Sequence, residues 1–296
     1  MSIYRGIVTH TDQLTPSLVR VTLGGAGVAE YLSTGIGDEY VRVFFPHGDD
    51  PTDVSLPIPD GDWWSTPEGA PDAPMRTYTI SGVRQERGEL DIDFVVHSSG
   101  VAGPWAAAAR PGHVLGLNAP TGLYAPHPET SWQVLVSDLT GLPAIARILA
   151  DVPETIRTRA VIEVASEKDQ IELPAGPHIE VTWVRGGNGH GPSALGQIVR
   201  SVVDDRLPLG EGYIWVAGET IALRDARKYL RRELELPVTH FKVVGYWTPI
   251  AQWDSKFAAL PAEVQRELDA IWTETADADP EDVQLRFESR LDELGL

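Results

Sequence analysis

The sequence predicts a two-domain protein of the β plus α/β class, in which an antiparallel β-barrel precedes an open parallel sheet of the nucleotide-binding type. Two observations predict this fold. Short β-rich segments bounded by turn residues fill roughly the first 125 positions, and strands then alternate with helices of about ten to fifteen residues. We therefore expect a barrel domain over residues 1–126, an α/β domain over 127–247 and a helical tail over 248–296.

The predicted barrel strands are rich in Val, Ile, Thr, Tyr and Phe and end at Gly, Pro, Asp or Asn. One short segment, GPWAAAARPG, interrupts them with a helical pattern, and the proline-rich stretch from His47 to Pro74 indicates a long loop. A succession of such strands is typical of an antiparallel barrel. The strands are GIVTHTDQL, SLVRVTLGG, EYVRVFFP, RTYTISGV, ELDIDFVVH and HVLGLNAP.

The second half alternates strands with amphipathic helices, which predicts βαβ units and a parallel sheet. Its first strands lack polar alternation, as expected for strands covered on both faces. The predicted strands are QVLVSDL, RAVIEVAS, HIEVTWVRG, GYIWVAG and THFKVVGYW. The predicted helices are TGLPAIARILADV, SALGQIVRSVV and TIALRDARKYLRREL, followed by the surface helices PAEVQRELDAIW and PEDVQLRFESRLDELGL of the tail.

Composition excludes several classes of function. The 24 Lys and Arg residues against 43 Asp and Glu give a net charge of −19, which argues against nucleic acid or an anionic membrane as partner. The absence of cysteine excludes disulfides, a thiolate nucleophile and cysteine-held metal clusters. No apolar run is long enough for a signal peptide or a membrane span, so we expect a cytoplasmic protein, and a monomer. Neither G-x-S-x-G nor H-E-x-x-H occurs, so a hydrolase is not expected.

The segment MRTYTIS alternates along a predicted strand. Arg76, Tyr78 and Ile80 should share one face, with the threonines and the serine on the other. Alternation alone predicts only a half-buried barrel strand.

The first strand of the predicted sheet ends in SDLTGLP, and ligands of open α/β sheets bind at the carboxyl ends of their strands. Asp138 and Thr140 therefore either line a ligand site or cap the helix that begins near Pro143, and the residues leave both interpretations open. The dinucleotide motif G-x-G-x-x-G is absent after this strand. GGNGHG, at 186–191, follows the third strand and indicates a flexible loop.

Several motifs in order carry a family resemblance. RTYTIS matches a flavin motif R-x-Y-T, and DIDFVVHSSGVAGPWAAAARPG matches a segment D-x-D-x-V-x-H followed by G-P and an alanine-rich helix. APTGLY, SDLTGLPAIARIL, WVAGETIALRDARKYLRREL and VVGYW match later motifs. Over most of its length the chain resembles the siderophore-interacting proteins, the FAD-containing ferric-siderophore reductases of the ferredoxin-reductase superfamily.

The resemblance implies an FAD site on the barrel. Arg76 would pair with the flavin phosphate, since a guanidinium fork matches two phosphate oxygens. Tyr78 would pack against the isoalloxazine and Thr79 would hydrogen-bond its polar edge. The pyrophosphate cradle and the helix that supports it would comprise His97, Val101, Ala102, Gly103 and Trp105.

The resemblance also implies a nicotinamide nucleotide, NADPH or NADH, as electron donor. Asp138, Thr140, Gly218 and Glu219 would hold this nucleotide, with Tyr246 and Trp247 near the flavin face. The 2′-phosphate of NADPH needs cationic or hydroxyl partners beyond the second or third strand. Because such residues follow both strands here, NADPH is favoured over NADH. The candidates are Ser166, Lys168 and Arg185.

The sequence departs from the family pattern at two places that matter. A hydroxyl usual at the position of Gly103 is missing, and Ser98 or Ser99 is the candidate to replace it. Thr248 and Pro249 follow Tyr246–Trp247 where the family has arginine, so the stretch from Thr248 to Lys256 offers a weaker basic contact to an anionic siderophore.

The function implied is the passage of electrons from NAD(P)H through FAD to a ferric siderophore or other iron(III) chelate, for iron uptake. The flavin carries the chemistry, so no catalytic side chain and no protein-bound metal are expected. One alternative is a flavin-dependent diaphorase that reduces another acceptor, such as a quinone. The other is a non-catalytic binding protein on a degenerate flavoprotein scaffold, which would purify colourless.

Overall fold

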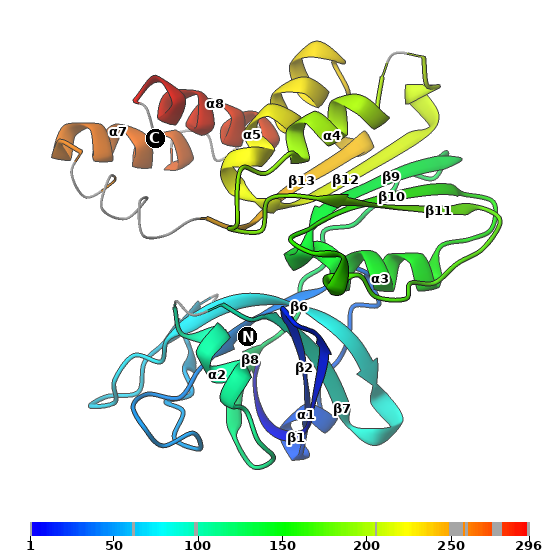
Figure 1. Ribbon diagram of the computed structural model, residues 1–296. Helices are drawn as coiled ribbons and strands as arrows, with labels where there is room; N and C mark the ends of the chain where they lie inside the picture. The colour runs from blue at the N-terminus through cyan, green and yellow to red at the C-terminus, as the bar shows by residue number, and fades with distance from the viewer. Residues whose placement is uncertain are drawn as a thin grey trace.

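The computed structural model describes residues 2–60, 63–97, 100–204, 206–248, 257, 260–273 and 280–294. Two domains stack on one another: a barrel holds the N-terminus, and a twisted sheet flanked by helices lies above it in Figure 1. The predicted fold class is confirmed, with a closed antiparallel barrel followed by a parallel sheet and C-terminal helices.

The barrel closes in the strand order β1-β2-β7-β6-β3-β8, and every neighbouring pair is antiparallel. Its inward-facing residues are fully buried, among them Val41, Ile80 and Ile92. The strands are β1 (Ile3–Thr15), β2 (Leu18–Gly24), β3 (Tyr40–Phe44), β6 (Met75–Arg84), β7 (Glu89–Val95) and β8 (Val114–Asn118), with the helices α1 (Ala26–Ala29) and α2 (Ala102–Ala108).

The predicted long loop between β3 and β6 contains a short hairpin that the sequence does not reveal. Strands β4 (Ile58–Asp60) and β5 (Trp63–Ser65) pair antiparallel within it. The Trp64 ring lies edge-on to Phe44 at 5.6 Å, which attaches the hairpin to the barrel. Because three-residue strands lie below the length at which a pattern is recognisable, the proline content dominates this part of the sequence.

The second domain is a parallel sheet in the order β11-β10-β9-β12-β13. The order reverses between β9 and β12, which makes their carboxyl ends the topological switch point where open α/β sheets bind ligands. The strands are β9 (Trp132–Asp138), β10 (Arg157–Val164), β11 (Ile179–Arg185), β12 (Gly212–Glu219) and β13 (Phe241–Trp247). The helices are α3 (Leu142–Asp151), α4 (Leu195–Val202) and α5 (Thr220–Lys228), the last continued by a π-helical turn over Tyr229–Glu233.

The tail forms the two predicted helices, α7 (Ala262–Thr273) and α8 (Pro280–Glu293). Helix α8 is more than a surface helix. The guanidinium of Arg227 on α5 is buried and lies 2.9 Å from Glu281 and 2.6 Å from Glu288, both buried as well. Removing one partner of such a buried pair leaves an uncompensated charge, so these contacts fix α8 on α5.

The two domains are joined by buried polar contacts. The indole N–H of Trp215 on β12 donates to the carboxylate of Asp38 in the barrel at 2.9 Å. Asp169, after β10, accepts from the Thr15 hydroxyl at 3.0 Å and the Ser17 backbone at 3.1 Å. Both carboxylates are almost fully buried. These hydrogen bonds, together with the linker, therefore set how the two domains lie relative to one another. No described helix is long and apolar enough to cross a membrane.

Candidate functional site

Asp138 lies at the end of β9, at the switch point, and its carboxylate is entirely buried. One oxygen accepts from the backbone and hydroxyl of Thr140, at 2.9 and 2.5 Å. The other accepts from the backbone of Glu219 at 2.9 Å and the indole N–H of Trp247 at 2.7 Å. Burial raises the pKa of Asp138, although the hydrogen bonds from these four donors act to lower it. The carboxylate therefore caps the loop and ties the ends of β9, β12 and β13 together.

Gly218 and Glu219 end β12 next to this carboxylate. Gly218 has a φ of +150°, and a Cβ there would lie 2.7 Å from both the Asp138 carboxylate and Leu195, so only glycine fits. Glu219 is half-buried, and burial together with the nearby carboxylates of Asp138 and Glu163 raises its pKa. Three carboxyl groups thus gather at the edge where the resemblance implies a nucleotide.

The GGNGHG segment is not the loose loop that its glycines predict. Asn188, at a φ of +56°, accepts from the backbone of Leu139 at 2.9 Å and donates to the carbonyl of Glu163 at 2.9 Å. The buried Glu163 carboxylate holds the far end of the segment, accepting from the backbone of Ala194 at 2.7 Å. A Cβ on Gly187 would come within 2.1 Å of that carboxylate. The segment is thereby fixed across the ends of β9 and β10.

On the barrel, β6 carries the R-x-Y-T motif in the predicted alternation. Arg76 and Tyr78 stand opposite the buried Val43 and Val41 of β3, so both share the inner face. The exposed Arg76 guanidinium donates to the carbonyl of Met75 at 2.7 Å and pairs with no carboxylate in the described parts of the chain. An exposed, unpaired arginine in so acidic a chain is available to an anionic ligand.

Tyr78 is a partly buried ring that packs against the barrel core. It packs on Phe94 with ring centroids 4.5 Å apart and the planes tilted by 47°. Burial raises the pKa of Tyr78 to about 12, so the phenol is neutral at physiological pH. A neutral, fixed aromatic ring suits packing against another flat ring.

Thr79 connects the flavin motif to the second domain. Its side chain is buried, and its hydroxyl lies 3.4 Å from the hydroxyl of Tyr246 on β13. Tyr246 packs edge-on against Trp215 at 6.3 Å, and burial raises its pKa. The structure thus brings the R-x-Y-T strand and the closing Tyr246–Trp247 pair together, although they are far apart in sequence.

The segment after β7 leads into α2 through close backbone contacts. Gly100 has a φ of +73°, and a Cβ on Gly103 would lie 2.5 Å from the carbonyl oxygen of His97, so glycine is required at both positions. Trp105 packs between Phe45 and Phe94, at 5.6 and 5.7 Å, and fixes α2 on the barrel. The first N–H groups of a helix, here at Val101 and Ala102, lack intrahelical acceptors. Ser98, Ser99 and residues 249–256 lie outside the described residues.

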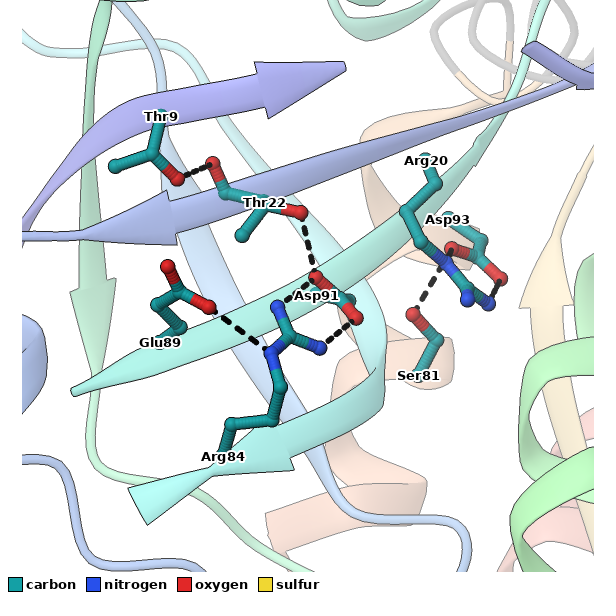
Figure 2. Close-up of polar contacts among 8 residues, drawn as sticks. All are labelled: Thr9, Arg20, Thr22, Ser81, Arg84, Glu89, Asp91 and Asp93. Atoms are coloured by element: carbon teal, nitrogen blue, oxygen red, sulfur yellow. Dashed lines mark hydrogen bonds and ion pairs between the residues drawn. The ribbon is translucent and has the colours of Figure 1, made fainter. Parts of the chain in front are cut away.

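A charged network on the outer face of the barrel supports β6 (Figure 2). Asp93 of β7 accepts from the Ser81 hydroxyl of β6 at 2.9 Å and pairs with Arg20 of β2 at 2.7 Å. Next to it, the guanidinium of Arg84 holds Asp91, which also accepts from Thr22 at 2.7 Å. Burial opposes ionisation of Asp91, but these contacts outweigh it, so its pKa is lowered. The network fixes β6 just beyond the R-x-Y-T motif.

The three candidates for a 2′-phosphate lie at the ends of β10 and β11. Val164 and Arg185 are register partners, so Arg185 stands close to the turn that begins at Ser166. The Ser166 hydroxyl accepts from the backbone of Lys168 at 3.2 Å and caps this turn. Both cations are exposed, and neither forms an ion pair within the described ranges. Glu167, which lies between Ser166 and Lys168 in sequence, is an exposed acid in the same turn.

Comparison with known proteins places the chain in a family. Residues 7–124 match the profile described as siderophore-interacting FAD-binding domain, and residues 130–249 match the one described as siderophore-interacting protein. The ferric vibriobactin reductase ViuB of Vibrio cholerae is 32% identical over 240 residues, which are 79% of this chain and 85% of that protein. The chain belongs to the siderophore-interacting protein family.

A further relative and a solved structure agree with this family assignment. The NADPH-dependent ferric-chelate reductase of Escherichia coli is 26% identical over 243 residues, 81% of this chain and 91% of that protein. The crystal structure of a siderophore utilization protein from T. fusca has a TM-score of 0.73 to this siderophore-interacting protein. Its sequence identity is 33%, and the match covers 84% of this chain and 94% of that one.

Some residues of the site in this siderophore-interacting protein are not apparent from sequence reasoning. Glu163 is the single acid in the buried strand RAVIEV, and an acid inside such a strand is a signal that could have been used. Asn188 stands among glycines and tolerates a positive φ, which is a weaker signal. Arg147 and Asp38 bridge the domains, and no local pattern marks such long-range partners.

Proposed function

We propose that the protein is an FAD-dependent ferric-siderophore reductase, which takes electrons from NADPH or NADH and releases iron(II) from iron(III) chelates. The observation that carries the proposal is the contact of the R-x-Y-T strand of the barrel with Tyr246 at the carboxyl end of β13, the strand next to the switch point. This contact supports a flavin half-site on the barrel that would face a nucleotide half-site on the sheet. The reductase names of the Vibrio and Escherichia relatives support the same activity.

The residues of the barrel fit FAD. Arg76 offers an exposed guanidinium without a carboxylate partner among the described residues, as a phosphate contact needs. Tyr78 offers a neutral ring fixed by Phe94. Thr79 offers its backbone and hydroxyl, and Gly100 and Gly103 allow the close backbone approach that a pyrophosphate cradle requires.

We assign the chemistry to the cofactor and the alignment to the chain. Bound FAD would supply the redox chemistry that links a two-electron nicotinamide donor to a one-electron iron(III) acceptor. Tyr78 would orient the flavin ring and Thr79 would hold its polar edge, while Asp138 holds Trp247 and the end of β12 in place. Reduction releases iron because hard oxygen donors bind iron(III) more strongly than iron(II).

On the nucleotide side, Thr140, Gly218 and Glu219 form the loops around Asp138, whose own oxygens are occupied by internal donors. We propose that Asp138 acts there by holding these loops. Ser166, Lys168 and Arg185 would receive a 2′-phosphate, which favours NADPH. We further propose the domain division 1–126, 127–247 and 248–296, and a monomer that acts in the cytoplasm, where the reduced nucleotide is available.

The absorption spectrum of the purified protein tests the cofactor. Protein supplied with FAD and passed through a desalting column should retain flavin bands near about 370 and 450 nm. Addition of NADPH under argon should bleach the 450 nm band. A colourless protein that also fails to retain added FAD would support the non-catalytic scaffold instead.

A further inference from the structure

Arg147 reaches from the α/β domain into the top of the barrel. It lies on α3, and its guanidinium donates to the carbonyl oxygen of Ile80 at 2.9 Å. The same nitrogen lies 3.7 Å from the carboxylate of Glu39, and the Arg147 side chain is only 15% exposed. Ile80 directly follows Thr79, so this contact ends on the strand that carries the flavin motif.

The barrel side of this contact is rigid. The backbone N–H of Ile80 donates to the carbonyl of Glu39 at 2.9 Å, so both backbone groups of Ile80 are fixed. The Glu39 carboxylate is fully buried and also accepts from the hydroxyls of Tyr31 and Ser33, each at 2.9 Å. Glu39 therefore keeps other donors without Arg147, whereas Arg147 supplies a side-chain donor to the Ile80 carbonyl.

Helix α3, which carries Arg147, connects it to the switch point. Helix α3 begins directly after the loop of Asp138 and Thr140, and it lies between the sheet and β6 (Figure 1). Helix and barrel touch closely, because a Cβ on Gly37 would lie 2.5 Å from the side chain of Ile148. The helix attached to the nucleotide-side loop is thus also the helix that holds the flavin-side strand.

We propose that Arg147 is a positioning residue that aligns the nucleotide half of the site with the flavin half, an inference that rests on the proposed function. Hydride transfer requires its two atoms to approach within about 3–3.5 Å, and a misplacement of about 1 Å costs up to about a hundredfold in rate. Among the described residues, two hydrogen bonds made by side chains of the second domain join that domain to β6, one donated by Arg147 and one accepted by Tyr246. The Thr79–Tyr246 contact, at 3.4 Å, is the weaker by length, which leaves Arg147 as the main one.

The test compares Arg147→Met, Arg147→Lys and the control Arg159→Met, which removes a half-buried arginine of β10 in the same domain that pairs with Glu180 at 3.8 Å. In anaerobic stopped-flow with saturating NADPH, Arg147→Met should slow reduction of the bound flavin by about 10- to 100-fold. The nucleotide concentration at half-maximal rate, FAD retention and reduction by dithionite should stay as in the wild type. Arg147→Lys keeps the charge and one donor and should be intermediate, and Arg159→Met should match the wild type.

Amide hydrogen exchange on the FAD-free protein gives a readout independent of activity. Peptides from β6 and α3 should exchange faster in Arg147→Met than in the wild type or in Arg159→Met. The proposal is overturned if Arg147→Met is reduced at the wild-type rate, if it loses FAD, or if exchange in β6 is unchanged. If Arg147→Met does not fold, a wild-type rate in Arg147→Lys overturns it. A wild type that binds FAD but is reduced by neither NADPH nor NADH would instead contradict the proposed donor.

Discussion

Replacing Arg76 by alanine is expected to give a folded protein that loses FAD. The side chain is exposed and, among the described residues, binds only the carbonyl of its neighbour Met75, so its removal should leave the barrel intact. A charge-assisted contact to a phosphate contributes about 1.5–3 kcal/mol, which corresponds to roughly a ten- to hundredfold loss of affinity. FAD titration by flavin fluorescence measures the effect.

The matched control is Arg5→Ala, which removes an exposed arginine from β1 of the same barrel. It lowers the positive charge of the domain by the same amount and should leave FAD affinity unchanged. If Arg76→Ala binds FAD as tightly as the wild type, or if Arg5→Ala loses it equally, Arg76 is only a barrel residue and the flavin interpretation of R-x-Y-T fails.

Replacing Asp138 by alanine should destabilise the α/β domain strongly. The change leaves the backbone N–H of Glu219 and the indole N–H of Trp247 without their acceptor at a buried position. Each unsatisfied buried donor costs about 1–3 kcal/mol, so the free energy of unfolding should fall by about 2–6 kcal/mol. Urea unfolding followed by tryptophan fluorescence measures it, because Trp247 itself reports on the site.

Two further variants make this prediction specific. Asp138→Asn keeps one acceptor but turns an amide toward two donors, so it should also be destabilised. Asp151→Ala, at the exposed end of α3, should change the unfolding free energy by less than about 0.5 kcal/mol. Wild-type stability of both Asp138 variants would mean that the carboxylate does not hold the ends of β9, β12 and β13.

The strand and helix pattern was sufficient to predict the architecture because each domain obeys one periodicity. Barrel strands show short β-rich runs, and the sheet shows apolar strands alternating with helices, as their burial on one or two faces requires. The strand pairing of β6 with β3 and β7 confirms the predicted alternation, in which Arg76, Tyr78 and Ile80 share one face. The β4–β5 hairpin escaped prediction because its strands are only three residues long.

The site was less accessible to sequence because its contacts are long-range. Asp138 could be placed at the switch point, but whether it faces a ligand or caps a loop depends on Glu219 and Trp247, which are far away in sequence. The GGNGHG segment is held by Glu163, a contact that the sequence does not reveal, because glycine content alone indicates only conformational freedom of the backbone. Arg147 had no local signature, since its acceptor belongs to the other domain.

The most direct test of the proposed function is the rate of iron(II) formation from a ferric hydroxamate chelate, measured under argon with FAD-loaded protein, NADPH and a ferrous-specific colour reagent. We expect turnover on the order of 1 s⁻¹ or faster that requires both FAD and the nucleotide. Parallel assays with a quinone as acceptor serve as the comparison. A protein whose bound flavin is reduced by NADPH and reoxidised by the quinone, but which forms no iron(II) from the chelate, would contradict the assignment as a ferric-siderophore reductase.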